Sequence, residues 1–259
     1  MRYYANIWPV LKAHVVDRPL VLKRYPEGAG GPMFFQQNAG EHVPDVVRVE
    51  AIDSKDDGPK DRIIGGDLAT LLYTVQIGAI EVHPKLSQVG DIDAADRCLI
   101  DLDPGPEVPF GAVVALTRDV LNVVHCCALP AAVKTSGSSG MHVVIPLPRA
   151  TSYQTSSALA MLVARVVTAQ TPERATVERS LRARPPGTIY VDAMQNARGR
   201  AWRARTVYAQ VMGRRCRSGS SRHAFARQRT HCGACRAVWP AWETCGETRS
   251  PHERKRRHS

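Results

Sequence analysis

The sequence predicts an α+β fold in which helices and strands form mixed layers around a core. Segments with alternating or β-branched apolar residues are interspersed with segments whose apolar residues recur at helical spacing. No internal repeat is present. Apolar residues make up 44% of the 259 residues, which is enough for a sizeable core in one large domain or two smaller ones.

Four segments have the periodicity of amphipathic helices. These helices are expected at residues 3–15, 66–79, 111–129 and 152–172. Asp67 is placed to cap the second helix, and Thr151 or Ser152 to cap the fourth, because short polar side chains accept hydrogen bonds from the first free backbone N–H groups.

The remaining apolar segments are expected to form strands. Strands are predicted at 19–26, 34–37, 46–52, 80–84, 98–103 and 188–196, and two strands flank the Ser/Gly turn within 131–147. The polar segment 54–62 is interpreted as a hairpin turn or loop.

Charge is divided unevenly along the chain. Residues 1–199 hold 20 Lys or Arg against 21 Asp or Glu, whereas residues 200–259 hold 15 against 3. The formal net charge of +11 therefore belongs to the final segment, which also contains no Leu or Ile. We expect a folded domain over 1–199 and a basic, Arg- and Cys-rich tail over 200–259 that is disordered or poorly packed.

Cysteine usage and hydropathy indicate the compartment. The seven cysteines are an odd number at irregular spacing, which argues against a disulfide framework. No apolar run approaches the roughly 18 residues of a membrane-spanning helix, and the N-terminus lacks the layout of a signal peptide. We therefore expect a cytoplasmic protein with no membrane partner.

Asp101 and Asp103 follow a short apolar run and precede Pro-Gly. In an extended backbone the two carboxylates point to the same face, with Leu102 turned into the core. Converging carboxylates repel each other unless a cation lies between them, and hard oxygen ligands suit Mg²⁺ or Mn²⁺. The alternative is that the pair is only the polar end of a strand.

Two later segments bear on the same chemistry. In KTSGSSGMH, residues 134–142, a turn of small residues is flanked by Lys134 and His142, which together could cradle a phosphate. A plain flexible hairpin is the alternative. Asp192 again follows a β-branched run, and a single aspartate at a strand end can equally be structural.

Taken in order, these segments resemble the polymerase domain of bacterial DNA ligase D, of the archaeo-eukaryotic primase superfamily. The resemblance is carried by seven collinear motifs: RYYANIWPVL, RPLVLKRYPEG, FFQQNA, GAIEVHP, DLDPG, KTSGSSGMHVVIPL and RPPGTIYVDAMQNARG. They cover nearly all of residues 2–199, and their shared order is far more specific than any single motif. The resemblance implies a primase-type polymerase core whose sheet carries the catalytic aspartates.

The resemblance also implies a reaction. Members of that family are nucleotidyltransferases that act in DNA double-strand-break repair by non-homologous end joining. Their two divalent ions, Mn²⁺ or Mg²⁺, are bound by aspartates that correspond to Asp101, Asp103 and Asp192. A primer 3′-hydroxyl attacks the α-phosphate of a ribo- or deoxynucleoside triphosphate, and a template directs the addition.

Further residues correspond to the family's nucleotide-binding positions, namely His83, Ser136, His142, Phe34, Phe35 and Lys23. The first three would contact the incoming nucleotide, the two aromatic rings would stack on bases, and the lysine would contact a phosphate or DNA. Packing in the core is the alternative for Phe34.

The implied partners are nucleic acids and repair proteins. The family binds gapped or 3′-overhanging DNA ends and nucleoside triphosphates. We expect this chain to depend on a separate DNA ligase and on a Ku-type end-binding protein, and to associate with the nucleoid in a bacterium.

The chain departs from the family pattern at three places. Gln37 and Ser139 stand where relatives usually carry lysines, so we expect weaker binding of nucleotide or DNA. The sequence begins at MRYY, where relatives usually have a further segment with a lysine for the DNA 5′-phosphate, so we expect impaired end recognition. The third departure is the tail.

The tail replaces a family strand whose arginine contacts the triphosphate. When residues 200–217 are back-translated with GC-rich codons and read two bases later, they yield GVASAYSVRASDGATVS, which has the form of that strand. We infer a shift of reading frame near Gly199, which the nucleotide sequence would test. The alternative is a functional tail, in which cysteines and histidines bind zinc and arginines bind nucleic acid.

These departures leave two hypotheses for function. The presence of all three presumed metal ligands favours an active nucleotidyltransferase. The missing lysines and arginine strand favour a catalytically silent remnant, or a module that binds DNA ends without turnover.

Overall fold

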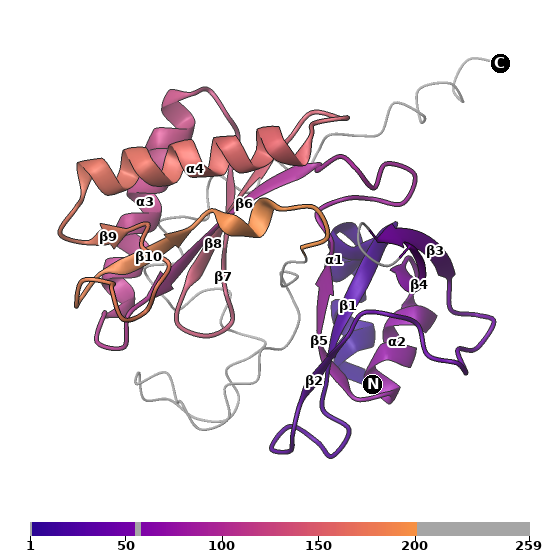
Figure 1. The fold of residues 1–259 in the computed structure, drawn as a ribbon. Coiled ribbons are helices and arrows are strands. Elements are labelled where there is room, and N and C mark those ends of the chain that lie inside the picture. The colour runs from indigo at the N-terminus through magenta and orange to yellow at the C-terminus, as the bar shows by residue number, and fades with distance from the viewer. Residues whose placement is uncertain (1, 55–57, 201–259) are drawn as a thin grey trace.

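The computed structural model describes residues 2–54 and 58–200. The predictions of a disordered tail, a zinc site and a shifted reading frame concern residues that lie, apart from Arg200, outside this described range. Within it the chain forms two five-stranded sheets, each accompanied by two helices. Figure 1 shows how these elements are arranged. The predicted α+β class is confirmed.

The first sheet is built from the N-terminal part of the chain. Its strands are β1 (Arg18–Arg24), β2 (Phe34–Gln36), β3 (Val49–Ser54), β4 (Gly58–Gly65) and β5 (Ala79–Pro84). They are antiparallel in the order β2-β1-β4-β3, and β5 also pairs with β1. Helices α1 (Arg2–Val15) and α2 (Leu68–Gln76) pack on this sheet through a core that includes Leu11, Leu22 and Leu71.

The second sheet follows along the chain. Its strands are β6 (Arg97–Pro104), β7 (Ala132–Thr135), β8 (Met141–Pro146), β9 (Ala175–Thr176) and β10 (Ile189–Asp192). Their order is β7-β8-β6-β10-β9, antiparallel except for the parallel pair of β9 and β10. Helices α3 (Phe110–Cys126) and α4 (Tyr153–Gln170) run along this sheet, and the short 3₁₀ helix η1 (Met194–Asn196) follows β10.

The two faces of β6 have opposite character because side chains alternate along a strand. Cys98, Ile100 and Leu102 are fully buried in the core that α3 and α4 cover. Asp101 and Asp103 point to the other face and keep part of their surface exposed. The helices therefore bury one face of the sheet and leave the opposite face free for polar side chains.

Helix capping agrees with the sequence. The Asp67 carboxylate accepts a hydrogen bond from the backbone N–H of Thr70, and the Ser152 hydroxyl accepts one from Thr155. Ser152, not Thr151, is therefore the N-cap of α4.

Three predictions of secondary structure were incomplete. The strand predicted over 188–196 was wrong for 194–196, which form the 3₁₀ helix η1, because the Asp192 carboxylate accepts a hydrogen bond from the Met194 N–H and ends the strand. The prediction of a hairpin turn or loop over 54–62 was wrong for 58–62, which belongs to β4, because pairing with β3 outweighs the poor strand propensity of GPKDR. The two-residue strand β9 was missed, since so short a segment has no periodicity to detect.

Ion pairs and hydrogen bonds connect the two halves of the molecule. The guanidinium of Arg18, on β1, is fully buried, pairs with the carboxylate of Asp96 and donates to the carbonyl oxygen of Lys85. Within the second half, the buried side chain of Asn196 accepts a hydrogen bond from the Leu99 N–H and donates one to the Leu99 carbonyl oxygen, which holds η1 against β6.

Within the described range, no helix combines the length and the apolar character that are needed to cross a membrane. The three cysteines in this range, at positions 98, 126 and 127, are all free.

Candidate active site

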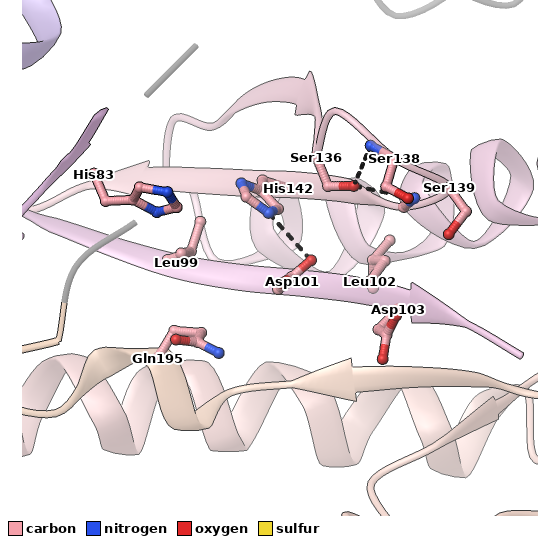
Figure 2. A pocket seen from close by; sticks show the side chains of 11 residues that line it. His83, Leu99, Asp101, Leu102, Asp103, Ser136, Ser138, Ser139, His142 and Gln195 are labelled. Atoms are coloured by element: carbon pink, nitrogen blue, oxygen red, sulfur yellow. Dashed lines mark hydrogen bonds and ion pairs between the residues drawn. The ribbon is translucent and has the colours of Figure 1, made fainter. Parts of the chain in front are cut away.

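Four titratable side chains lie in one row across the second sheet. Asp101 on β6 is opposed by Asp192 on β10 and by His142 on β8, and His142 is opposed by Lys134 on β7. Opposed residues of antiparallel strands point to the same side of a sheet. Nε2 of His142 lies 3.2 Å from Oδ1 of Asp101, as Figure 2 shows. The register of the sheet, rather than a loop, therefore brings these groups together.

Asp103 shares this face, two residues further along β6. Its register partner is Tyr190, and its Oδ2 accepts a hydrogen bond from Nη1 of Arg184 at 3.3 Å. The guanidinium carbon of Arg184 lies 4.1 Å from the centroid of the Tyr190 ring. Arg184 belongs to the loop before β10. Its positive charge partly neutralises Asp103, the most exposed carboxylate of the site.

Asp192 is held by the residues that follow it. Its Oδ1 accepts a hydrogen bond from the backbone N–H of Met194, and its Oδ2 accepts one from the side-chain amide of Gln195, both at 2.7 Å. The Tyr190 hydroxyl lies 3.3 Å from Oδ1, and burial together with the charge of Asp192 raises the pKa of this tyrosine. Tyr190 therefore remains a neutral hydrogen-bond donor at physiological pH.

The turn between β7 and β8 forms the opposite wall of the site. The Ser136 hydroxyl accepts hydrogen bonds from the backbone N–H groups of Gly140, at 3.1 Å, and Ser138, at 3.4 Å. A Cβ atom at Gly140 would collide with the carbonyl oxygen of Leu102. Glycine is required there because the turn lies directly on the strand that carries the aspartates.

These elements surround a pocket of about 300 Å³. His83 reaches it from β5 of the first sheet, and Asp101, Asp103 and His142 reach it from the second. Gln195 and the small residues of the Ser136 turn complete the wall. The pocket therefore lies where the two sheets meet.

His83 belongs to a second polar network on the first sheet. Its Nε2 lies 3.5 Å from Oε2 of Glu81, and Oε1 of Glu81 accepts a hydrogen bond from Lys23 at 3.0 Å. Burial lowers the pKa of Lys23, but hydrogen bonds to Tyr25 and Glu81 outweigh burial and raise it above its usual value. Lys23 is thus a permanent cation that is already paired with a carboxylate.

The two phenylalanines of FFQQ lie on the surface. Phe34 is 46% exposed and Phe35 is 54% exposed, which excludes the alternative that Phe34 packs in the core. The guanidinium carbon of Arg24 lies 5.2 Å from the Phe34 ring centroid, and the Phe35 ring meets His83 edge-on at 5.8 Å. Exposed rings beside a pocket residue can stack on nucleic-acid bases.

The donor chemistry of the site fits a hard divalent cation. Asp101, Asp103 and Asp192 supply carboxylate oxygens on one face of two paired strands, and such oxygens are the preferred ligands of Mg²⁺ and Mn²⁺. In residues 2–54 and 58–200, however, no three His, Cys, Asp or Glu side chains converge closely enough to hold an ion. Binding would require carboxylates to turn away from His142, Arg184 or Gln195.

The structure brings together most of the predicted site residues. Five of them line or border the pocket directly: Asp101, Asp103, His83, Ser136 and His142. Asp192 is linked to the pocket by its hydrogen bond from Gln195. Phe35 and Lys23 share the face of the first sheet that carries His83, whereas Phe34, opposite Arg24, points to the other face. Sequence reasoning missed Arg184, Gln195 and Glu81, because only the folded loops and the register show what these side chains contact.

At position 37, where the resemblance leads one to expect lysine, a neighbouring arginine supplies a positive charge. Gln37 stands where the resemblance leads one to expect lysine, and its amide oxygen accepts a hydrogen bond at 3.3 Å from Nη1 of Arg62 on β4. A positive charge is therefore still present beside this position. Ser139, at the other substituted position, lines the pocket.

Comparisons of sequence agree with this geometry. Residues 1–208 match the family described as "LigD, primase-polymerase domain". The chain is 30% identical over 198 residues to the multifunctional non-homologous end joining protein LigD of Pseudomonas aeruginosa, covering 76% of this chain and 23% of the relative. It is 28% identical over 201 residues to the bifunctional LigD of Bacillus subtilis, covering 77% of this chain and 32% of the relative. The chain thus spans about a quarter to a third of these relatives.

A solved structure has the same fold. The polymerase domain from Mycobacterium tuberculosis ligase D in complex with DNA matches with a TM-score of 0.72 and 27% identity, over 78% of this chain and 73% of that one. The primase-type core implied by the motifs is confirmed. The match of the family to most of the chain, together with this fold, shows that the chain belongs to the LigD primase-polymerase domain family.

Proposed function

We propose that this chain is a metal-dependent nucleotidyltransferase that extends a DNA primer strand during the repair of double-strand breaks by non-homologous end joining. The observation that carries the proposal is the placement of Asp101, Asp103 and Asp192 on one face of β6 and β10, beside a pocket lined by His83, Ser136 and His142. Three carboxylates facing a polar pocket are suited to phosphoryl transfer.

The proposed ligands of the divalent ions are Asp101, Asp103 and Asp192. Bound Mn²⁺ or Mg²⁺ would activate the primer hydroxyl and stabilise the charge that develops on the phosphates. Each carboxylate is also held by a neighbour, since Asp101 meets His142, Asp103 meets Arg184 and Asp192 meets Gln195. Binding of the ions would exchange some of these contacts for metal–oxygen contacts.

The pocket residues would bind the nucleotide. The Ser136 turn presents hydroxyl groups and backbone to the triphosphate, and His83 and His142 supply ring N–H donors from both sides. The 3′-oxygen of the primer would form a bond to the α-phosphorus while the bond between the α-phosphorus and its bridging oxygen breaks. Pyrophosphate leaves, and the hydroxyl proton is released to solvent.

The exposed surface beside the pocket would hold the nucleic acid. Phe34 and Phe35 are proposed to stack on bases, and Lys23 to approach a phosphate from the same sheet. The related polymerase domain from Mycobacterium tuberculosis was solved in complex with DNA, which supports a DNA end as the partner. A DNA ligase and a Ku-type protein are proposed as further partners, because relatives of this chain are non-homologous end joining proteins.

Primer extension tests the proposal. The full chain is incubated with Mn²⁺, nucleoside triphosphates and a labelled duplex that has a templated 3′ end. We expect the wild type to extend the primer and Asp101→Asn to lose at least about 100-fold in rate, the order expected when an electrostatic group of the transition state is removed. Asp53→Asn, an exposed position on β3, is the matched control and should extend normally.

The alternative of a silent remnant or an end-binding module predicts a different result. In that case the folded wild type would bind the duplex and leave the primer unchanged at every Mn²⁺ concentration. Binding without extension by the wild type would overturn the proposed activity while leaving the fold and the DNA interaction intact.

A further inference from the structure

Two buried cations lie on the same face of the first sheet as His83. Lys85 follows β5, two residues after His83, and its backbone N–H donates to Pro19 on β1. Arg62 lies on β4, two residues before Ile64, which is the register partner of Pro19. Because side chains alternate along strands, both cations share the face that His83 presents toward the pocket.

Both side chains are almost completely buried. Lys85 is 7% exposed and Arg62 is 6% exposed. Charged side chains are rarely buried to this extent unless they are paired with an opposite charge. The immediate surroundings should therefore contain a carboxylate.

No carboxylate pairs with either cation in the described part of the chain. Arg62 has a single hydrogen-bond partner, the neutral amide of Gln37, and its Nε is buried without a partner. The neighbouring acidic groups are already engaged. Glu50, which lies opposite Arg62 on β3, pairs with Arg48. Glu81 binds Lys23, and Asp96 binds Arg18.

The local charge is positive. Burial, together with the nearby charges of Arg62 and Arg198, lowers the pKa of Lys85 to about 8. Arg198 follows η1, whose segment Figure 1 shows reaching from the second sheet toward the first. Arg198 is paired with Asp93, so Arg62 and Lys85 are the two neighbouring cations that lack a paired carboxylate among the described residues.

We propose that Arg62 and Lys85 form a binding site for a phosphate group beside the candidate active site. A phosphate carries the missing negative charge, and its oxygens can accept several hydrogen bonds from a guanidinium and an ammonium group at once. The chemistry of this site does not depend on the proposed polymerase function. The source of the phosphate rests on the proposed function: it is either a nucleic-acid strand or a nucleoside triphosphate.

The first experiment uses inorganic phosphate as the probe. The thermal midpoint of the full chain is measured while phosphate replaces chloride at constant ionic strength, because a ligand that binds the folded state raises this midpoint. We expect a rise for the wild type and an at least tenfold weaker apparent affinity in Lys85→Met and in Arg62→Gln. Arg165→Gln, an exposed position on α4, is the matched control and should respond like the wild type.

Lys85→Arg keeps the charge and should retain phosphate binding, which separates loss of the site from general damage to the fold. Circular dichroism spectra establish that each variant is folded. An equal phosphate response in the wild type, Lys85→Met and Arg62→Gln would overturn the proposal.

The second experiment identifies the source of the phosphate. If a DNA strand supplies it, Lys85→Met should reduce the slope of log affinity against log salt by about 0.7 for single-stranded DNA. If a nucleotide supplies it, the affinity for ATP should fall at least fivefold while that slope stays constant. No change in either quantity would contradict the proposal, even if the wild type extends primers normally.

Discussion

Asp101 and Asp192 lie directly opposite each other on the antiparallel strands β6 and β10. Their side chains point to the same face, so two negative charges are placed next to each other by backbone hydrogen bonds alone. Such a placement is unfavourable unless cations compensate it. In the proposed function, divalent ions bound by the carboxylates would supply this compensation.

Replacing Asp192 with asparagine should separate function from folding. Asparagine keeps the oxygen that accepts from the Met194 N–H, but its amide nitrogen cannot accept from Gln195. We expect a stability loss of about 1.5–3 kcal/mol, typical of a lost hydrogen bond to a charged group, together with loss of primer extension. Urea unfolding and the extension assay measure the two effects. Normal extension by Asp192→Asn would exclude this residue as a required ligand.

Arg184 competes with a metal ion for Asp103. Its guanidinium lies 3.3 Å from the carboxylate, and 56% of the Asp103 side chain is exposed, so the ion pair is partly screened by solvent. Pairs of this kind contribute about 0.2–1 kcal/mol. Arg184→Gln should therefore tighten Mn²⁺ binding to the free protein by up to about fivefold. Electron paramagnetic resonance of free Mn²⁺ measures this affinity, and weaker binding by the variant would disprove the competition.

Gly140 should not tolerate a side chain. A Cβ atom would collide with the Leu102 carbonyl oxygen and push the Ser136 turn away from β6. We expect Gly140→Ala to lose about 1–3 kcal/mol of stability and to bind nucleotide more weakly. Gly111 on α3 is the matched control because a Cβ there meets no atom within 4 Å. Gly111→Ala should be neutral or slightly stabilising, and equal effects of the two substitutions would contradict the close approach.

Lys85 should make stability depend on pH. Burial and nearby cations lower the pKa of Lys85 from its ordinary value of 10.5 to about 8 in the folded chain. Between these two pH values the unfolded chain binds more protons than the folded chain, so the free energy of unfolding rises with pH. At pH 7 both states are protonated and the full cost of the buried charge is present. Lys85→Met should therefore be more stable than the wild type by about 1–3 kcal/mol near neutral pH.

Unfolding experiments from pH 7 to pH 10 check this difference. The advantage of Lys85→Met should shrink as the pH rises through 8 and should be smaller still near pH 10. An advantage that is independent of pH would show that Lys85 is not a buried cation. Chloride buffers free of phosphate are needed, since a bound phosphate would offset the cost.

The elements of the fold could be predicted because their patterns are local. Apolar periodicity located all four helices, and a polar side chain before the second and the fourth identified their caps. The aspartates of β6 were placed on one face by simple alternation. Strand β4 could not be predicted because its polar residues become strand only by pairing with β3.

The site could be predicted only as far as the motifs extend. Asp101, His142 and His83 were found through their motifs, and the sheet register then showed that the first two are neighbours. Arg184 is the first residue of the motif RPPGTIYVDAMQNARG and Lys85 directly follows GAIEVHP, yet neither motif singles out these two side chains. Their importance comes from what they contact and from burial, neither of which a single sequence records.

The proposal that this chain is a template-directed nucleotidyltransferase is tested most directly by the fidelity of single-nucleotide addition. Four duplexes that differ only in the first unpaired template base are each supplied with one nucleoside triphosphate at a time, with Mn²⁺ and the full wild-type chain. We expect the wild type to add one nucleotide, with a strong preference for the complement of the template base, and Asp101→Asn to lose this addition. Folded wild-type protein that binds these duplexes but adds no nucleotide, or adds all four without regard to the template, would contradict it.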